Sequence, residues 1–359
     1  MWIVPLFNHV KRWFCEGDLL YKVRDIFHVP ALAAACVKDG ELIFAEVVGE
    51  RKIGSGELIR LDDAFHLGSC TKAMTATMLA ILVERGSLSW DAKIIDVFPE
   101  AADAIHPGFH SITLVHLLSH KAGLPKDVRP DRNFFPKLRE MSGPVVFQRY
   151  ELVKLVLANP PSYRPGECMV YSNYGYVVAA AMAEKVTGKS WEELMKTLIF
   201  KPLGMESAGF GPPRDVWGHR RLIFTCQPIA PGPDADNPPV LAPAGGIHCS
   251  VKDWAKFVSE HLKGLQGNSK LLSKETFEFL HKDHYDQGYA LGWLVVERSW
   301  AGGLALTHGG SNGLWFAVVW VAPKRNIAFL AATNCGGKLA FSACQAAISK
   351  MIKRFLSYR

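Results

Sequence analysis

Ser69 and Lys72 form an S-x-x-K element whose spacing suits nucleophilic catalysis. Residues three apart on a helix share a face, so an amine at Lys72 would lie beside the Ser69 hydroxyl. A serine hydroxyl is a weak nucleophile until a neighbouring base takes its proton, and unpaired N–H groups at a helix start favour a developing oxyanion. About one such pair is expected by chance. The residues alone leave open a plain helix cap at Ser69 followed by a lysine that reaches solvent.

An uncharged run predicts the helix that carries this element. Between Ala73 and Val83 only two threonines interrupt Ala, Met, Leu, Ile and Val. A helix that is apolar on all sides is buried. Since a buried lone ammonium is costly, we expect Lys72 to be paired or to have a lowered pKa.

Tyr171, Ser172 and Asn173 form a second element, Y-x-N. Roughly 0.2 such pairs are expected by chance. A phenol close to the Lys72 ammonium would have its pKa lowered from about 10 towards the range that a general base needs. The same residues are equally suited to capping the apolar helix predicted at Gly175–Val186.

His308, Gly309, Gly310 and Ser311 form a third element after a predicted strand. Glycines beside a strand let a substrate approach the backbone closely. A backbone N–H there would serve as a second oxyanion donor. A glycine-rich hairpin turn explains the same residues without any function.

Strands are predicted at both ends of the chain, with helices between them. An Asp-Gly turn joins the first two strands. The predicted strands are 30–37, 41–48, 290–298, 304–308, 315–321 and 327–333, and a helix follows at 340–355. We therefore expect an α/β domain with an all-α insertion.

The expected domain boundaries place the three elements at a seam. The α/β domain would comprise residues 18–90 and 240–359, and the mainly helical subdomain residues 91–239. Six prolines between Cys226 and Pro243 exclude regular helix or interior strand and predict a long surface crossing between the two parts. Clefts at such seams are preferred ligand sites.

The order and spacing of the three elements resemble the serine β-lactamase and penicillin-binding-protein superfamily. The similar branch comprises class C β-lactamases, D-aminopeptidases and family VIII carboxylesterases. Five further stretches also look familial: Phe65–Gly68, Leu117–Leu124, Pro165–Glu167, Lys201–Met205 and Ala244–Gly246. The resemblance implies a β-lactamase-like fold, an antiparallel sheet flanked by helices plus a helical subdomain, and no cofactor.

The resemblance also implies a role for each residue. Ser69 would be the acylated nucleophile, Lys72 and Tyr171 would share proton transfer, and Asn173 would bond Lys72 and the substrate. The backbone N–H groups of Ser69 and Ser311 would form the oxyanion hole. Whether Lys72 or Tyr171 is the initial base stays open, because such a pair titrates as a unit.

One departure from the family pattern bears on the substrate. Where many members present Lys-Thr-Gly, this chain has His308, Gly309 and Gly310. Histidine is mostly neutral at pH 7, so we expect a weak hold on the carboxylate of a β-lactam or a D-alanyl peptide. The predicted activity is that of a carboxylesterase, which hydrolyses short acyl esters through an acyl-Ser69 intermediate. The alternatives are a D-amino-acid peptidase or weak β-lactamase, and a catalytically silent penicillin-binding protein.

Other residues near these elements admit two interpretations. Five aromatic residues suit either an acyl pocket or the core: Trp293, Trp315, Phe316, Phe134 and Phe135. Two histidine pairs, His116 with His120 and His106 with His110, lack a third ligand at a matching spacing. No metal site is therefore predicted.

Composition narrows the class of protein. The chain has 359 residues, 49% of them hydrophobic, and a net charge of +7, which excludes a disordered or fibrous protein. It has no run of five like charges, so a nucleic-acid partner is not expected. The longest apolar stretch, around residues 314–322, is too short for a transmembrane span. The expected partner is a small acyl substrate, and the oligomeric state is not predicted.

Cysteine usage and the N-terminal residues suggest a location. Eight singly spaced cysteines fit a reduced compartment. The apolar run from Trp2 to Phe7 precedes its basic residues, the wrong order for a secretory signal. We expect a cytoplasmic enzyme, or a periplasmic one if a leader has been removed. The segment from Trp2 to Phe14 is also suited to peripheral membrane contact as an amphipathic anchor.

Overall fold

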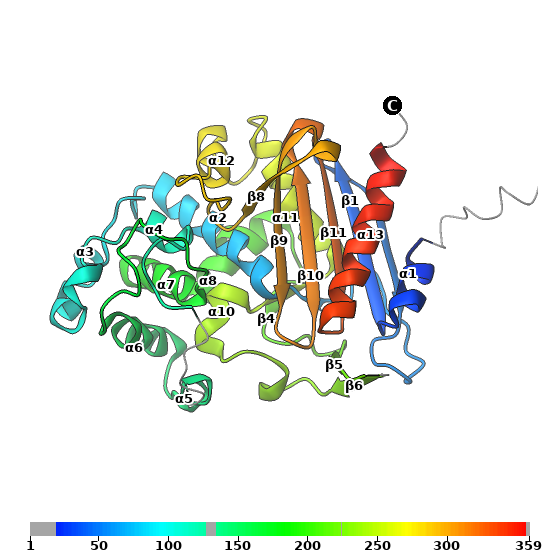
Figure 1. The fold of residues 1–359 in the computed structure, drawn as a ribbon, viewed down its shortest axis with the longest axis horizontal. Coiled ribbons are helices and arrows are strands. Elements are labelled where there is room, and N and C mark those ends of the chain that lie inside the picture. Colours follow the sequence, from blue (N-terminus) through cyan, green and yellow to red (C-terminus); the bar gives the residue numbers. More distant parts are fainter. Residues whose placement is uncertain (1–18, 127–133, 224, 357–359) are drawn as a thin grey trace, which may run out of the picture.

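The computed structural model describes residues 19–126, 134–223 and 225–356 (Figure 1). A six-stranded antiparallel sheet has the strand order β2-β1-β11-β10-β9-β8. Its strands are β1 (Ala31–Lys38), β2 (Glu41–Gly49), β8 (Leu294–Arg298), β9 (Gly303–Ser311), β10 (Phe316–Ala322) and β11 (Ile327–Thr333). Leu32 of β1 lies opposite Thr333 of β11, so strands far apart in the sequence are neighbours in one sheet.

Alternate residues of β1 enter two different cores. Leu32, Ala34 and Cys36 pack with α1 (Leu19–Phe27) and α13 (Lys338–Leu356), whereas the intervening alanines belong to the larger core on the opposite face. Side chains of a strand alternate between faces. Because helices cover both faces, β1 is apolar almost throughout. Figure 1 shows α13 (red) and α1 (blue) on one face of the sheet, with α2, α7 and α11 on the other.

The central helix α2 (Thr71–Glu84) is buried from Thr71 to Leu82, as its uncharged sequence predicts. The other helices lie around it or cover the sheet: α3 (Ile94–Val97), α4 (Leu114–Leu118), α5 (Phe134–Glu140), α6 (Val145–Leu157), α7 (Asn173–Thr187), α8 (Trp191–Met195), α9 (Lys201–Leu203), α10 (Ala242–Gly245), α11 (Val251–Gly264) and α12 (Lys274–His281). Five short strands complete the fold: β3 (Phe65–His66), β4 (Gly209–Phe210), β5 (Gly218–Arg221), β6 (Cys226–Ile229) and β7 (Ile247–Cys249).

The proline-rich segment differs from the predicted surface crossing. Cys226–Ile229 forms strand β6, which pairs only with β5. Pro228 is tolerated because a two-stranded sheet leaves one edge of each strand unpaired. Beyond two short 3₁₀ turns the chain enters α10 and is buried from Val240 to Pro243. This end of the segment is therefore part of the core.

Two features concern the membrane interpretation. Among the described residues no helix is both long and apolar enough to cross a bilayer. The proposed anchor from Trp2 to Phe14 lies outside the described residues.

Candidate active site

Ser69 lies in a 3₁₀ turn, Gly68–Cys70, that leads directly into α2. Gly68 has a φ of +50°, a left-handed conformation that glycine adopts readily. A Cβ at Gly68 would also lie 2.4 Å from the backbone nitrogen of Ser311 in β9. The N-cap of α2 is Cys70, so the interpretation of Ser69 as a plain helix cap is wrong.

Lys72 is fully buried and donates hydrogen bonds to three segments of the chain. Its Nζ lies 3.2 Å from Ser69 Oγ, 2.5 Å from Asn173 Oδ1 and 2.7 Å from the carbonyl oxygen of Ala244. An ammonium group has three N–H donors, so these oxygens can satisfy it in full. The alternative in which Lys72 reaches solvent is therefore wrong, and the burial of its charge is compensated.

Two neighbouring helices carry two of the three acceptors of Lys72. Asn173 is the first residue of α7, which packs on α2. Ala244 lies in α10, which is fixed to α2 because the Thr75 hydroxyl donates to the carbonyl of Pro243 at 2.7 Å. The position of the amine therefore depends on segments that are distant in sequence.

Tyr171 lies against the same amine. The Lys72 Nζ is 4.9 Å from the centroid of the Tyr171 ring. The Tyr171 ring is also 4.3 Å from the His120 ring and 6.3 Å from the His308 ring, centroid to centroid. The structure thus brings the S-x-x-K, Y-x-N and His-Gly-Gly elements to one place.

The third element is part of a strand and not a hairpin turn. Strand β9 continues through Gly309 and Gly310 to Ser311, which pairs with Phe316 of β10. A Cβ at Gly310 would lie 2.5 Å from the backbone nitrogen of Ser69. Only glycine permits this approach, which places the backbone nitrogens of Ser69 and Ser311 at the same junction.

His308 is buried and neutral. Its Nδ1 lies 2.8 Å from the carbonyl oxygen of Gly309 and its Nε2 lies 3.2 Å from the hydroxyl of Tyr289. A carbonyl can only accept, so Nδ1 carries the proton and Nε2 accepts from Tyr289. Burial, reinforced by the charge of Lys72, lowers the pKa of His308 to about 3. Both ring nitrogens are engaged within the protein, and the ring carries no charge at neutral pH.

His120 has a place in the site that the sequence analysis missed. The residue has a φ of +59°, and its Nδ1 accepts a hydrogen bond of 3.2 Å from the backbone N–H of Ser172. Burial, with smaller effects from Lys72 and His308, lowers its pKa well below the usual value. This neutral ring packs against Tyr171. The only sequence feature that pointed to His120 was its place in the familial stretch Leu117–Leu124.

A second group of residues contacts the site and is centred on Asp236, which was not a candidate in the sequence analysis. Asp236 lies in the proline-rich segment, and its carboxylate accepts from His66 Nε2 at 3.0 Å. His66 Nδ1 in turn accepts from the backbone N–H of Gly68 at 3.1 Å. Asn312 Nδ2 donates to the same carboxylate at 3.1 Å. Asp236 therefore joins the residue before Ser69 to the residue after Ser311.

The charge of Asp236 is stabilised by these partners. Burial raises its pKa, but the contact with His66 and the hydrogen bonds from Asn312 and Asn237 lower the pKa overall. The carboxylate is thus ionised at neutral pH.

The aromatic residues that suited either an acyl pocket or the core are packed against other side chains where the structure describes them. Trp293 and Trp315 are buried in the larger core, and the Phe316 ring lies 5.5 Å from that of Phe341. The side chains of Phe134 and Phe135 lie outside the described part.

Three of the four histidines in the two predicted pairs make local hydrogen bonds. His106 and His116 bond residues of their own turns, and His110 Nε2 lies 3.0 Å from the carbonyl of Ile105. In the described ranges no three His, Cys, Asp or Glu side chains are grouped as metal ligands.

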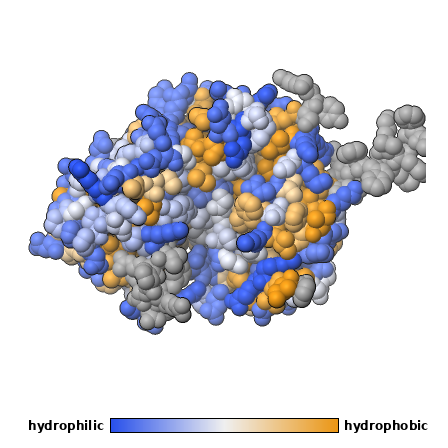
Figure 2. Space-filling model, in the orientation of Figure 1, coloured by the Kyte–Doolittle hydropathy of each residue, from blue (hydrophilic) through white to orange (hydrophobic). Residues whose placement is uncertain are grey.

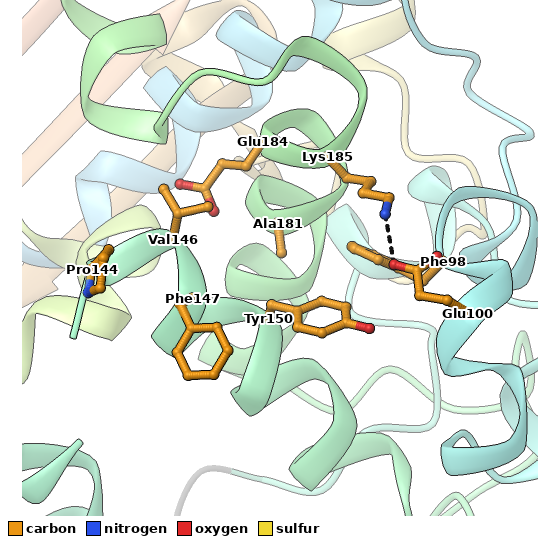
Figure 3. A pocket seen from close by; sticks show the side chains of 9 residues that line it. All are labelled: Phe98, Glu100, Pro144, Val146, Phe147, Tyr150, Ala181, Glu184 and Lys185. Carbon is orange, nitrogen blue, oxygen red and sulfur yellow. Dashed lines mark hydrogen bonds and ion pairs between the residues drawn. The ribbon is translucent and has the colours of Figure 1, made fainter. Parts of the chain in front are cut away.

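A pocket of about 520 Å³ lies apart from these residues, between α6, α7 and the segment after α3 (Figure 3). Phe98, Phe147 and Tyr150 line it, and Lys185 bonds Glu100 at 2.6 Å on its rim. Its α7 residues begin at Ala181, roughly 12 Å along the helix axis from Asn173. The pocket is therefore separate from the candidate active site.

The sequence matches the family model described as Beta-lactamase over residues 22–347. It is 26% identical to penicillin-binding protein 4 of Amycolatopsis lactamdurans, covering 93% of this chain and 87% of that protein. It is 31% identical to the lovastatin esterase of Penicillium rubens, over 50% of this chain and 49% of the esterase.

Solved structures share the fold. The octameric penicillin-binding protein homologue from Pyrococcus abyssi superposes with a TM-score of 0.75 at 23% identity, covering 96% of this chain and 80% of that one. EstCE1, a hydrolase with promiscuous acyltransferase activity, superposes with a TM-score of 0.76 at 20% identity, covering 94% and 96%. These structures confirm the predicted β-lactamase-like fold.

Proposed function

Because this chain belongs to the β-lactamase family of hydrolases, we propose that it is a serine hydrolase that cleaves short neutral acyl esters through an acyl-Ser69 intermediate. The observation that carries the proposal is the buried Lys72 amine, 3.2 Å from Ser69 Oγ. A serine hydroxyl is a weak nucleophile until a neighbouring group takes its proton, and Lys72 is within reach to do so. The similarity to the lovastatin esterase supports ester substrates.

In the proposed acylation, Ser69 Oγ attacks the ester carbonyl as its proton passes to the pair formed by Lys72 and Tyr171. The backbone N–H groups of Ser69 and Ser311 stabilise the charge that develops on the carbonyl oxygen. The loss of one such donor typically lowers a rate about a hundred- to a thousandfold. The alcohol leaves with a proton from the same pair, and water then releases the acid by the reverse sequence.

The preference for neutral esters rests on His308. A substrate carboxylate needs a cation, and His308 is buried, neutral and bonded to Gly309 and Tyr289. Its position in the family pattern is the one that supplies a lysine in many members. We therefore propose that the protein prefers carboxylesters to β-lactams or D-alanyl peptides as substrates.

A substrate panel tests this proposal. Rates on p-nitrophenyl acetate and butyrate, nitrocefin and D-alanyl p-nitroanilide are measured with the wild type and with Ser69→Ala. The proposal predicts ester hydrolysis that depends on Ser69 and exceeds the other rates. Faster turnover of nitrocefin or of the D-alanyl amide would assign the chain to the β-lactamase or peptidase alternative. No turnover of any substrate would indicate the catalytically silent alternative.

A further inference from the structure

Two cysteines from distant segments have their sulfur atoms in contact. Cys226 begins strand β6, and Cys335 lies between β11 and α13. Their Sγ atoms are 3.3 Å apart, although 109 residues separate them in the sequence. An S–S bond is about 2.0 Å long, so a small approach of the two sulfurs would reach bonding distance.

The surroundings make the two thiols unequal. Arg221 Nη1 donates to Cys226 Sγ at 3.3 Å. The hydrogen bond from Cys335, together with Arg221, lowers the pKa of Cys226, whereas the same contact and burial raise the pKa of Cys335. A thiolate is the nucleophilic form of cysteine. The pair therefore consists of a reactive sulfur at Cys226 and a protonated partner at Cys335.

The other buried cysteines provide a contrast. Burial is the largest effect on Cys36, Cys70, Cys249 and Cys344 and raises the pKa of each thiol. Cys226 is buried, but Leu222 and Ile223, a few residues before it in the same hairpin, are exposed. Figure 2 shows apolar side chains gathered on the surface around α13 and the β5–β6 hairpin.

We propose that Cys226 and Cys335 are a site of reversible disulfide formation by hydroperoxides. The Cys226 thiolate attacks a peroxide oxygen, so that an S–O bond forms, the O–O bond breaks and hydroxide leaves. The Cys335 sulfur then attacks the sulfenic acid, losing its proton as the S–S bond forms and water departs. For hydrogen peroxide, two thiols lose two electrons in total and two waters are produced.

The bond would fasten the β5–β6 hairpin to the turn before α13. That hairpin already contacts the segment after β9, because the backbone N–H of His219 donates to the carbonyl of Leu314 at 3.0 Å. The site makes no use of Ser69 or Lys72, so it stands whether or not the proposed esterase activity is correct.

Differential alkylation of the full chain tests the proposal. Reduced protein is treated with increasing hydrogen peroxide, quenched with N-ethylmaleimide and mapped by mass spectrometry without reduction. We expect a linked Cys226–Cys335 peptide at doses that leave Cys168, a partly exposed cysteine, alkylatable. Dithiothreitol should restore both thiols, and Cys168→Ser should form the same linked peptide.

Single variants separate the two steps. In Cys335→Ser, Cys226 should accumulate as a sulfenic acid that dimedone captures, and in Cys226→Ser, Cys335 should remain alkylatable. The proposal is overturned if wild-type Cys335 stays fully alkylatable while Cys168 is oxidised, or if Cys226 links to another cysteine. Because the wild-type experiment decides this alone, poor folding of a variant does not remove the test.

Discussion

Asn173 accepts a hydrogen bond of 2.5 Å from Lys72, and 101 residues of sequence separate them. Asn173 begins α7, and Lys72 lies in the first turn of α2, so the contact depends on the packing of two helices. The same Nζ contacts Ser69 Oγ. The hydrogen bond to Asn173 therefore orients the Lys72 amine towards the Ser69 hydroxyl.

Replacing Asn173 should slow acylation without unfolding the protein. In Asn173→Ala the buried Nζ loses an acceptor and its orientation, and we expect kcat to fall roughly ten- to a hundredfold. Asn173→Asp should instead move the acidic limb of the pH–kcat profile to higher pH, because an added carboxylate favours the protonated amine. Asn268→Ala, at an exposed position, is the control. An unchanged kcat in Asn173→Ala would show that Asn173 does not position Lys72.

Replacing Asp236 should lower kcat, because Asp236 holds the segments around Gly68 and Asn312 in place. Asp236→Asn weakens the contact with His66, which holds Gly68, and the contact with Asn312. We expect kcat to fall about tenfold with little change in KM, because the segments that carry the oxyanion donors lose a support while no substrate-binding group is removed. The matched control is Asp234→Asn, an exposed carboxylate of the same segment. Equal kcat values for the two variants, with a lower Tm for Asp236→Asn alone, would indicate a purely structural role.

A charge at position 308 should change substrate preference. We expect His308→Lys to raise the ratio of nitrocefin to p-nitrophenyl butyrate kcat/KM by at least about tenfold, since a cation favours a substrate carboxylate. His308→Asn, which adds no charge, is the control and should keep the ester preference. A ratio that stays the same in His308→Lys would mean that residue 308 does not face the substrate.

Two histidines that contact each other, His261 and His281, should make the fold sensitive to acid. His261 Nδ1 and His281 Nε2 lie 2.8 Å apart, and burial lowers the pKa of His281 to about 3 and that of His261 well below its usual value. Between pH 6.5 and about 3 the unfolded chain binds protons that the folded chain does not, so stability is complete above pH 6.5 and falls as the pH decreases. Each such histidine contributes a slope of roughly 1.4 kcal/mol per pH unit.

Thermal unfolding from pH 7 to pH 4 measures this effect. Tm should fall towards low pH in the wild type and fall less steeply in His281→Gln. The control is Lys274→Gln, which changes an exposed residue of the same helix. Equal slopes for wild type and His281→Gln would contradict the assignment.

Local sequence patterns predict the scaffold better than they predict the support of the site. The uncharged run after Lys72 correctly predicts the buried helix α2, and the apolar runs 30–37 and 327–333 correctly predict the strands β1 and β11. These features follow from periodicity and composition, which act over short distances along the chain. The family resemblance is confirmed, whereas the two-part domain boundaries and the roles of the individual residues remain predictions.

Long-range contacts account for what the sequence did not reveal. Asp236 reaches His66 across 170 residues and Asn312 across 76, from a proline-rich segment expected to be only a surface crossing. Gly310 was assigned to a hairpin turn or a strand end, but its glycine is needed because Ser69 lies against it. No local rule predicts which backbone will pack against a given glycine.

The most direct test of the account is covalent labelling of Ser69. A fluorophosphonate ester is incubated with wild type and Ser69→Ala, and the adduct is located by intact mass and peptide mapping. We expect one adduct per chain, on Ser69, formed in step with the loss of esterase activity and absent from Ser69→Ala. An adduct on another residue, or esterase activity that survives in Ser69→Ala, would contradict it.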